Sequence, residues 1–432
     1  MISTNEIQNR KFNAKLYPIY KMLSWDLLFY YSIIFLFLVQ EKGFSASQVL
    51  LGEAFFTASC FLLQIPLGIL VDRIGKKYSL IFANVCMCVF SLMLLGVKTY
   101  NQLLFSFFID AIGYVIKGVC ETNILYDSLP RGKKRGSLYS TIDGVGASRY
   151  YIIDSITSLI AGFAYVVNPY LPIILCSVTN FISLILSTRF KHTQVSAEET
   201  ESKKSLKRYF KHLREIAKFS IKSRRMLCLL VFFGIISGLI YSMTTFRSGV
   251  LQHINLEEQY FGIILAISQF TASIFSRAQN IIHNKFRNKT LAFLGIPLTF
   301  SCIIIGILAT LKVTIITTFI IIFLFVMQGA VKGAYNVLIY RYLNNFTNRK
   351  IRIKLATIRN MIYNAFTTII TLIGAWLLSV TNAANTILII GCVLSILIVI
   401  LLDYMRGRVG LKVELYKSED LKYSSITEQI GE

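Results

Sequence analysis

Long runs of apolar residues alternate with short polar segments along almost the whole chain. Stretches such as "YYSIIFLFLV", "YSLIFANVCMCVFSLMLLGV" and "NTILIIGCVLSILIVILL" contain no charged residue. A helix needs about 20 mostly apolar residues to cross a bilayer, and these segments are too long for barrel strands. The pattern therefore predicts an all-α integral membrane protein with twelve transmembrane helices, near residues 16–40, 46–70, 78–98, 101–129, 138–166, 170–188, 226–250, 259–281, 290–311, 315–342, 353–379 and 384–403.

The composition supports a membrane protein and explains the high net charge. The 432 residues are 55% hydrophobic and 16% charged, whereas soluble domains carry about 25% charged residues. The 45 Lys and Arg residues outnumber the 22 Asp and Glu residues, which gives a net charge of +23. Most of the Lys and Arg residues fall in the two tails and in every second loop. This is the positive-inside pattern. It predicts a multi-pass protein of the cytoplasmic (inner) cell membrane with both termini cytoplasmic and no nucleic-acid partner. The opposite surface is expected to hold Lys42, Lys98, Arg247 and Lys312.

Cysteine and histidine offer no chemistry of their own. The eight cysteines lie singly in apolar runs without a CxxC spacing, and the four histidines fall in predicted loops. This pattern does not favour disulfides, zinc or an imidazole relay. The sequence also has no GxxxxGK[ST] loop and no catalytic triad. We therefore expect neither an enzyme nor a bound cofactor or metal.

One long polar segment, residues 189–225, divides the chain into two halves of six predicted spans each. It predicts an N-terminal bundle over 1–188, a cytoplasmic central loop, a C-terminal bundle over 226–404 and a cytoplasmic tail over 405–432. The second half of the loop places Leu206, Phe210, Leu213 and Ala217 on one helical face. An amphipathic helix on the inner leaflet and a solvated linker helix both fit this pattern.

The two halves resemble each other in sequence. Span 4 contains "KGVCETNILYDSL" and span 10 contains "KGAYNVLIYRYL", while spans 5 and 11 begin "STIDG" and "ATIRN". Matches in the same order indicate a duplication of six spans. Parallel repeats of this kind form transporters whose substrate site lies between the repeats.

The stretch "GILVDRIGKK", residues 68–77, is the most specific motif in the chain. It resembles the signature loop between helices 2 and 3 of the major facilitator superfamily, with matches at Gly68, Asp72, Arg73, Gly75, Lys76 and Lys77. The resemblance covers roughly residues 14–404 and implies two pseudo-symmetric six-helix bundles. "ETNILYDSL" in span 4 also looks like a segment of a drug-efflux-like bacterial branch.

The resemblance also implies a role for the loop. In the family, the loop's acid caps the start of helix 11 and joins a charge cluster that holds the outward-facing state shut. Carried over, that gating role falls to Asp72 and Arg73, with Asp127 as a partner. The alternative is that Arg73, Lys76 and Lys77 are ordinary positive-inside anchors.

Charged residues inside the predicted spans are the candidates for the functional site, because such charges are costly in a bilayer. They occur in spans 1, 2, 4, 5, 10 and 11, whereas the interiors of spans 3, 6, 9 and 12 have none. In the family's fold, helices 3, 6, 9 and 12 are peripheral, so the charges follow the helices near the cavity. Some of these groups could instead form interhelical hydrogen bonds or ion pairs.

A buried carboxylate can bind a proton near neutral pH, because low dielectric favours its neutral form. Asp26 is the first candidate for proton coupling, and Glu53, Asp110 and Glu121 are the others; Lys117 lies one turn before Glu121 and can pair with it. The residues expected to line a substrate cavity are Tyr30, Lys117, Asp143, Arg149, Tyr150, Asp154, Tyr241, Lys332, Asn336, Asn360 and Asn364.

These observations favour a secondary active transporter that exports a small organic solute in exchange for protons. Proton-coupled uptake of a polar or zwitterionic solute is the second reading, and a sensor or lipid-handling protein on the same fold is the third. Many antiporters of the superfamily carry a Gly-Pro-rich motif in helix 5, whereas span 5 here contains no proline, two acids and an arginine. This difference weakens the case for efflux and leaves the substrate open. The expected partners are a small molecule, protons and membrane lipid, and a monomer is expected.

Overall fold

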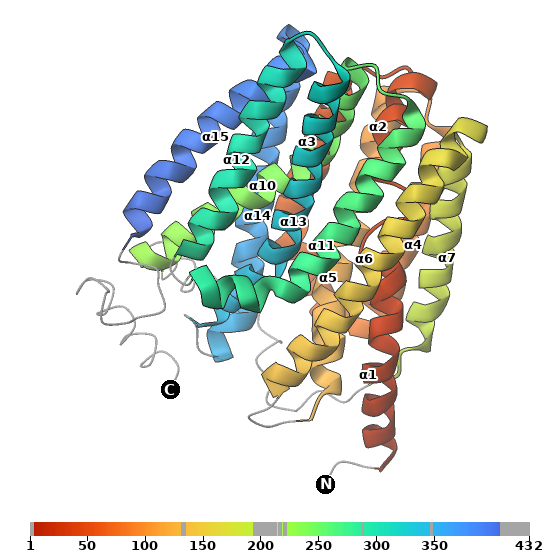
Figure 1. The fold of residues 1–432 in the computed structure, drawn as a ribbon. Coiled ribbons are helices and arrows are strands. Elements are labelled where there is room, and N and C mark those ends of the chain that lie inside the picture. The colour runs from red at the N-terminus through yellow and green to blue at the C-terminus, as the bar shows by residue number, and fades with distance from the viewer. Residues whose placement is uncertain are drawn as a thin grey trace. The chain divides into compact units, whose positions relative to one another are not determined.

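A computed structural model describes residues 4–130, 135–192, 214, 218, 223–286, 289–345 and 349–406. The regular elements in these ranges are all helices, with no strand among them (Figure 1). Eleven helices are long and apolar enough to cross a membrane, and they correspond to predicted spans 2 to 12. The predicted all-α membrane fold is therefore confirmed, while the amphipathic segment of the central loop lies almost wholly outside the described residues.

The helices form two compact units. The first contains Met1–Ser45, Phe55–Tyr209 and Glu258–Ala266, and the second contains Ala46–Ala54, Phe210–Glu257 and Ile267–Glu432. Helices α3 and α11 therefore contribute residues to both units. The helix bounds are α1 (Thr4–Ser24), α2 (Ile34–Leu36), the π-helix η1 (Phe37–Glu41), α3 (Ala46–Ile74), α4 (Lys76–Gly96), α5 (Tyr100–Ser128), α6 (Arg135–Val167), α7 (Leu171–Arg189), α10 (Arg224–His253), α11 (Glu258–Phe286), α12 (Thr290–Thr310), α13 (Ile315–Asn345), α14 (Arg349–Val380) and α15 (Ala383–Met405).

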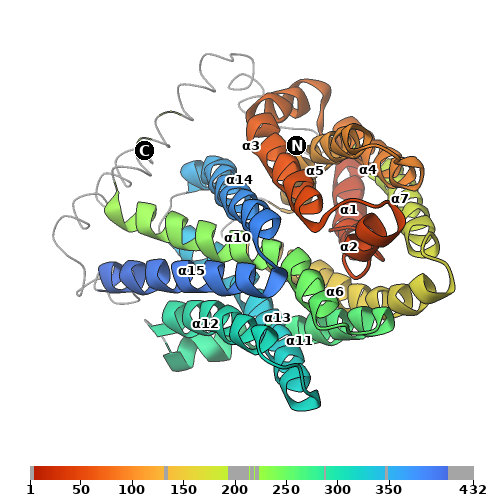
Figure 2. The same ribbon diagram turned by 90° about the horizontal axis from the view of Figure 1, so that it is seen from above.

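The same pattern of helix packing occurs in both units. In the first unit, α1 packs against α5, α6 and α7, and α4 packs against α5 and α7. In the second unit, α10 packs against α13, α14 and α15, and α12 packs against α13 and α15. Figure 2 shows α10 beside α14 and α15. Helices α1, α4, α5, α6 and α7 thus have counterparts six spans later in α10, α12, α13, α14 and α15, which agrees with the duplication inferred from the sequence.

The first predicted span is the one that does not form a continuous helix. Helix α1 ends at Ser24, residues 25–33 form turns, and the helical path resumes at Ile34. Phe29 has a positive φ of 64°, and the Asp26 side chain accepts the N–H of Leu27 at 2.9 Å. Such local side-chain bonds compete with helix formation. Irregular backbone at membrane depth is tolerated where protein surrounds it, and residues 27–30 are buried.

The tight turn expected from "GILVDRIGKK" is present and consists of one residue. Helix α3 ends at Ile74 and α4 begins at Lys76, with Gly75 between them at φ 95° and ψ 147°. This region of backbone conformation is open almost only to glycine. The Gly75 N–H donates to Val71 O at 2.9 Å, and its carbonyl accepts from the Ser79 N–H at 3.1 Å. Gly75 is therefore required by the backbone itself.

Replacing Gly75 with alanine should lower the melting temperature of the detergent-purified protein. An added Cβ would meet no atom within 4 Å, so the cost is backbone strain alone, about 1–3 kcal/mol. Gly96→Ala is the matched control, because Gly96 also has open space around it but no positive φ. Equal melting temperatures for the two variants would contradict the role assigned to Gly75.

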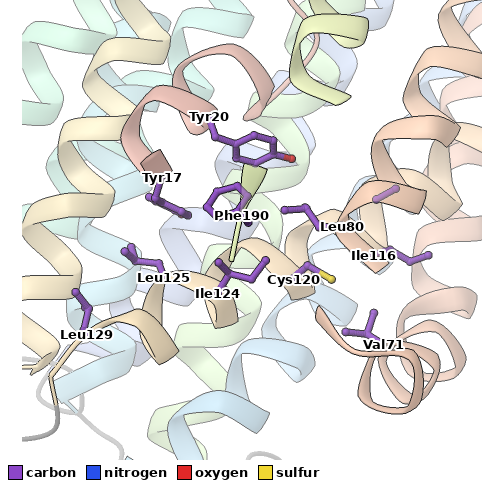
Figure 3. Close-up of a cluster of buried hydrophobic side chains, with 11 residues drawn as sticks. Tyr17, Tyr20, Val71, Leu80, Ile116, Cys120, Ile124, Leu125, Leu129 and Phe190 are labelled. Atoms are coloured by element: carbon purple, nitrogen blue, oxygen red, sulfur yellow. The ribbon is translucent and has the colours of Figure 1, made fainter. Parts of the chain in front are cut away.

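A cluster of buried apolar side chains fills the first unit on one side of α1. Figure 3 shows Tyr17 and Tyr20 of α1 together with Leu80 of α4, Cys120 of α5 and Phe190, which follows α7. The rings of Tyr20 and Phe190 meet edge to face with centroids 5.3 Å apart. The hydroxyl of Tyr17 leaves this apolar cluster and donates to Asp143. Charged groups next to the cluster therefore lie in a medium of low polarity.

Candidate functional site

A buried ion pair joins α1 and α6 in the first unit. Lys21 Nζ lies 2.5 Å from Asp143 Oδ1, and the Tyr17 hydroxyl donates to the same oxygen at 2.7 Å. The Lys21 ammonium also lies over the Trp25 ring, 4.7 Å from its centroid. Lys21 is only 5% exposed, so Asp143 provides the charge that makes its burial tolerable.

Sequence reasoning predicted Asp143 but missed Lys21. Lys21 was interpreted as one of the basic residues of the N-terminal tail, although it lies inside the apolar segment that begins at residue 16. The sequence did contain a signal for Lys21, because this residue lies one helical turn after Tyr17 and shortly before the acid Asp26. A lysine inside a span needs a partner, and the structure shows that partner on α6.

A second contact joins α5 to the end of α1. Lys117 Nζ donates to the backbone carbonyl of Ser24 at 2.5 Å, and the Ser24 hydroxyl donates to Glu121 Oε1 at 3.3 Å. The last carbonyls of a helix lack partners within the helix and carry partial negative charge. The ammonium of Lys117 therefore caps α1 where the first span breaks. The expected ion pair between Lys117 and Glu121 does not form in this part of the chain; Ser24 lies between them.

These contacts belong to one set of charges, the α1–α5–α6 charge network, which consists of Lys21, Asp26, Asp110, Lys117, Glu121 and Asp143. Glu121 is within electrostatic range of Lys117, Lys21 and Asp143. Asp110 is within range of Asp26 and Lys117. Helices α1, α5 and α6, with the segment that follows α1, thus bring four acids and two lysines together in one unit.

Aromatic side chains lie beside this network. The Trp25 ring meets the rings of Tyr150 and Tyr151 edge to face, with centroids 5.1 and 5.3 Å apart. Tyr30 is buried and contacts Tyr31 in the same way at 5.1 Å. On α6, Tyr150 and Asp154 are buried, whereas Arg149, expected with them to line the cavity, is exposed because it lies on a different face of the helix.

The second unit contains Glu53 and the predicted residues of the C-terminal half. Glu53 of α3 accepts a hydrogen bond from the Thr245 hydroxyl of α10. Asn360 on α14 accepts a hydrogen bond from Arg359 at 2.5 Å. Four further predicted residues lie on α10, α13 and α14. Asn364 is buried, and the other three, Tyr241, Lys332 and Asn336, are half-buried.

Arg247 corrects one prediction about the surface. It was expected at the membrane face opposite the basic loops, but it lies inside α10 and is 8% exposed. Apolar residues on both sides of Arg247 allow α10 to continue to His253. The predicted span 226–250 already included Arg247, but hydropathy does not show which face of a helix is buried, so sequence reasoning missed this buried arginine of the second unit.

The loop motif forms a contact between α4 and α5. Lys76 makes an ion pair with Asp127 at the end of α5. Asp72 and Arg73 are exposed, Lys77 is half-buried, and Gly68 is buried within α3. Asp127, expected as a partner of Asp72 and Arg73, is thus paired with a lysine of the same motif. The approach of Asp72 to the start of span 11 stays a prediction.

Comparisons with known proteins agree with this architecture. A family model described as Major Facilitator Superfamily matches residues 21–321. The crystal structure of the nucleoside transporter NupG superimposes with a TM-score of 0.70 at 15% identity, covering 92% of this chain and 100% of that chain. A crystal structure of the peptide transporter POT in complex with sulfate gives 0.63 at 14% identity, covering 96% of each. No curated protein sequence matches the chain.

Proposed function

The chain belongs to the major facilitator superfamily and is a membrane transporter of that type, and we propose that it moves a small organic solute across the cytoplasmic membrane by proton-coupled alternating access. The observation that carries the proposal is the α1–α5–α6 charge network. Four acids and two lysines on three helices and the break that follows α1 are more than a static bundle requires. Acids that gain and lose protons there would change which groups pair.

The contacts of the network suggest how a proton would act. Asp143 holds Lys21, and Glu121 is joined through Ser24 to Lys117. A proton on either acid removes its negative charge and weakens its hold on the neighbouring cation. Because Lys117 caps the end of α1, the charge state of α5 is linked to the backbone of the first span. The turn at residues 68–77, with Asp72 and Arg73, would serve as the cytoplasmic gate.

The direction of transport has two candidates. Export in exchange for protons is supported by the resemblance of the segment "ETNILYDSL" to a drug-efflux-like branch. Uptake of a polar or zwitterionic solute is favoured by a different observation, namely that acids and lysines occur in the same buried network. Transport measured under both orientations of the proton gradient separates the two candidates.

Asp26→Asn tests the coupling. Wild-type protein in proteoliposomes, screened over a panel of small organic solutes, should accumulate at least one solute about tenfold under an imposed pH gradient, and a protonophore should abolish that accumulation. Asparagine has the shape of the protonated acid but cannot titrate, so the variant should lose uphill transport while still exchanging the solute at saturating concentration. Asp403→Asn, an exposed acid at the end of α15, is the control and should behave as wild type.

Two outcomes would count against this assignment. Accumulation that is independent of the pH gradient for every transported solute would overturn proton coupling. Proton-driven accumulation that survives Asp26→Asn would move the coupling site to Asp110, Glu121 or Glu53.

A further inference from the structure

Asp110 is a buried acid with an oxygen that nothing satisfies. Its residue is 6% exposed, and Oδ1 has no hydrogen-bond partner in the described part of the chain. Asp110 lies inside α5, a membrane-spanning helix. A buried polar atom without a partner is costly, so its retention needs an explanation, and a donor supplied by a bound ligand is one.

Asp26 interacts electrostatically with Asp110 and, like it, forms no ion pair in the described residues. Its Oδ1 accepts from two neutral donors, the Leu27 N–H at 2.9 Å and the Tyr31 hydroxyl at 2.8 Å. Asp26 and Asp110 interact electrostatically with each other, and both lie within electrostatic range of Cys176 on α7. The two carboxylates therefore converge on one region of the first unit.

The lysines of the charge network are engaged elsewhere. Lys21 pairs with Asp143, and the ammonium of Lys117 lies 2.5 Å from the Ser24 carbonyl. Lys117 reaches Asp110 only through longer-range electrostatic attraction. In residues 4–130 and 135–192, no ion pair is formed by either Asp26 or Asp110. The region thus has a surplus of negative charge and a shortage of hydrogen-bond donors.

The aromatic side chains at this region also suit a cation. Trp25 directly precedes Asp26 and already lies under the Lys21 ammonium at 4.7 Å. Tyr150, whose ring meets Trp25, lies within electrostatic range of Asp26. The face of an aromatic ring attracts ammonium groups. The two acids would repel an anionic solute, and an uncharged solute would lack the charge attraction that both the acids and the rings offer to a cation.

We propose that Asp26 and Asp110, with Trp25 and Tyr31, form a binding site for a protonated amine, so that the transported solute is an organic cation or carries an ammonium group. An ammonium has three N–H donors and no acceptor, which matches two carboxylates without an ion pair in the described residues, one of which, Asp110, has an oxygen without a donor. The backbone break at residues 25–33 places Asp26 outside a regular helix, so its side chain can face Asp110. The inference rests on the proposed transport function and names its substrate class.

Trp25 provides the readout for a direct test. The chain has two tryptophans, and Trp376 on α14 is 64% exposed, so Trp376→Phe leaves Trp25 as the reporter of the site. The purified protein in detergent is titrated with ethylamine, phenethylamine and putrescine at neutral pH, where these amines are protonated. Ethanol, 2-phenylethanol and 1,4-butanediol are their neutral analogues. At least one amine should change Trp25 fluorescence saturably and bind about tenfold or more tightly than its alcohol.

Acid variants in the same background complete the test. Asp110→Asn should weaken binding of that amine about tenfold or more, because the amide oxygen carries no full charge. Asp26→Asn should weaken it as well, which keeps the test decisive if the first variant does not fold. Asp403→Asn is the control and should leave the affinity unchanged.

Three results would overturn the amine site: no amine in the panel binds, an alcohol binds as tightly as its amine, or both acid variants keep wild-type affinity. The measurement is made without a membrane or a gradient, so its failure is distinct from failure of the transport proposal. Proton-driven accumulation without amine binding would support the transport proposal and contradict the amine site. Amine binding without proton-driven accumulation would support the amine site and contradict proton coupling.

Discussion

Asp143→Asn is expected to destabilise the first unit more than any other single change to its charges. The substitution leaves the Lys21 ammonium buried without its anion and deprives the Tyr17 hydroxyl of a charged acceptor. Breaking a buried ion pair from one side costs about 3–5 kcal/mol. The Asp143 side chain is 27% exposed, so water can partly replace the lost interaction with Lys21. The cost should therefore lie near the lower limit of this range. Thermal unfolding in detergent should show a clear decrease in melting temperature.

The matched test is a double-mutant cycle with Lys21→Met. Methionine fills a similar volume without a charge, so the double variant should be more stable than Asp143→Asn alone. Asp127→Asn provides a comparison, because it breaks the ion pair with Lys76 near the end of α5. Additive losses in the cycle would show that Lys21 and Asp143 do not depend on each other, contrary to the contact described.

Lys117→Met is expected to loosen the first span where it breaks. The carbonyl of Ser24 would lose its donor, and an unsatisfied buried acceptor costs about 1–3 kcal/mol. Glu121 would at the same time lose the nearest positive charge. Hydrogen–deuterium exchange should therefore increase in the segment that spans residues 22–33, and solute transport should decrease.

Glu121→Gln is the control for Lys117→Met. The amide oxygen can still accept from the Ser24 hydroxyl, and Lys117 can still donate to the Ser24 carbonyl. Exchange in residues 22–33 should then remain close to wild type, even where transport changes because an acid has been lost. Unchanged exchange in Lys117→Met would mean that the end of α1 is held by other contacts.

The sequence by itself determined the class of the fold. Apolar runs longer than about 20 residues can only be membrane helices, because lipid offers no partner for the backbone. The motif at residues 68–77 determined a tight turn, since one position needs a backbone conformation that only glycine adopts readily, and Gly75 has that conformation. The matching segments of spans 4 and 10 indicated the duplication that the helix packing shows.

Only the tertiary structure decided which charges meet. Hydropathy records that a residue is buried but not which partner it finds, and the decisive contacts join residues far apart in the chain. Lys117 and Ser24 are separated by 93 positions, and Lys21 and Asp143 by 122. The break of the first span is also a tertiary effect, because "WDLLFYYSI" is apolar enough for a helix. Its backbone can leave the helix only where neighbouring helices supply burial and donors, and here α5 does so through Lys117.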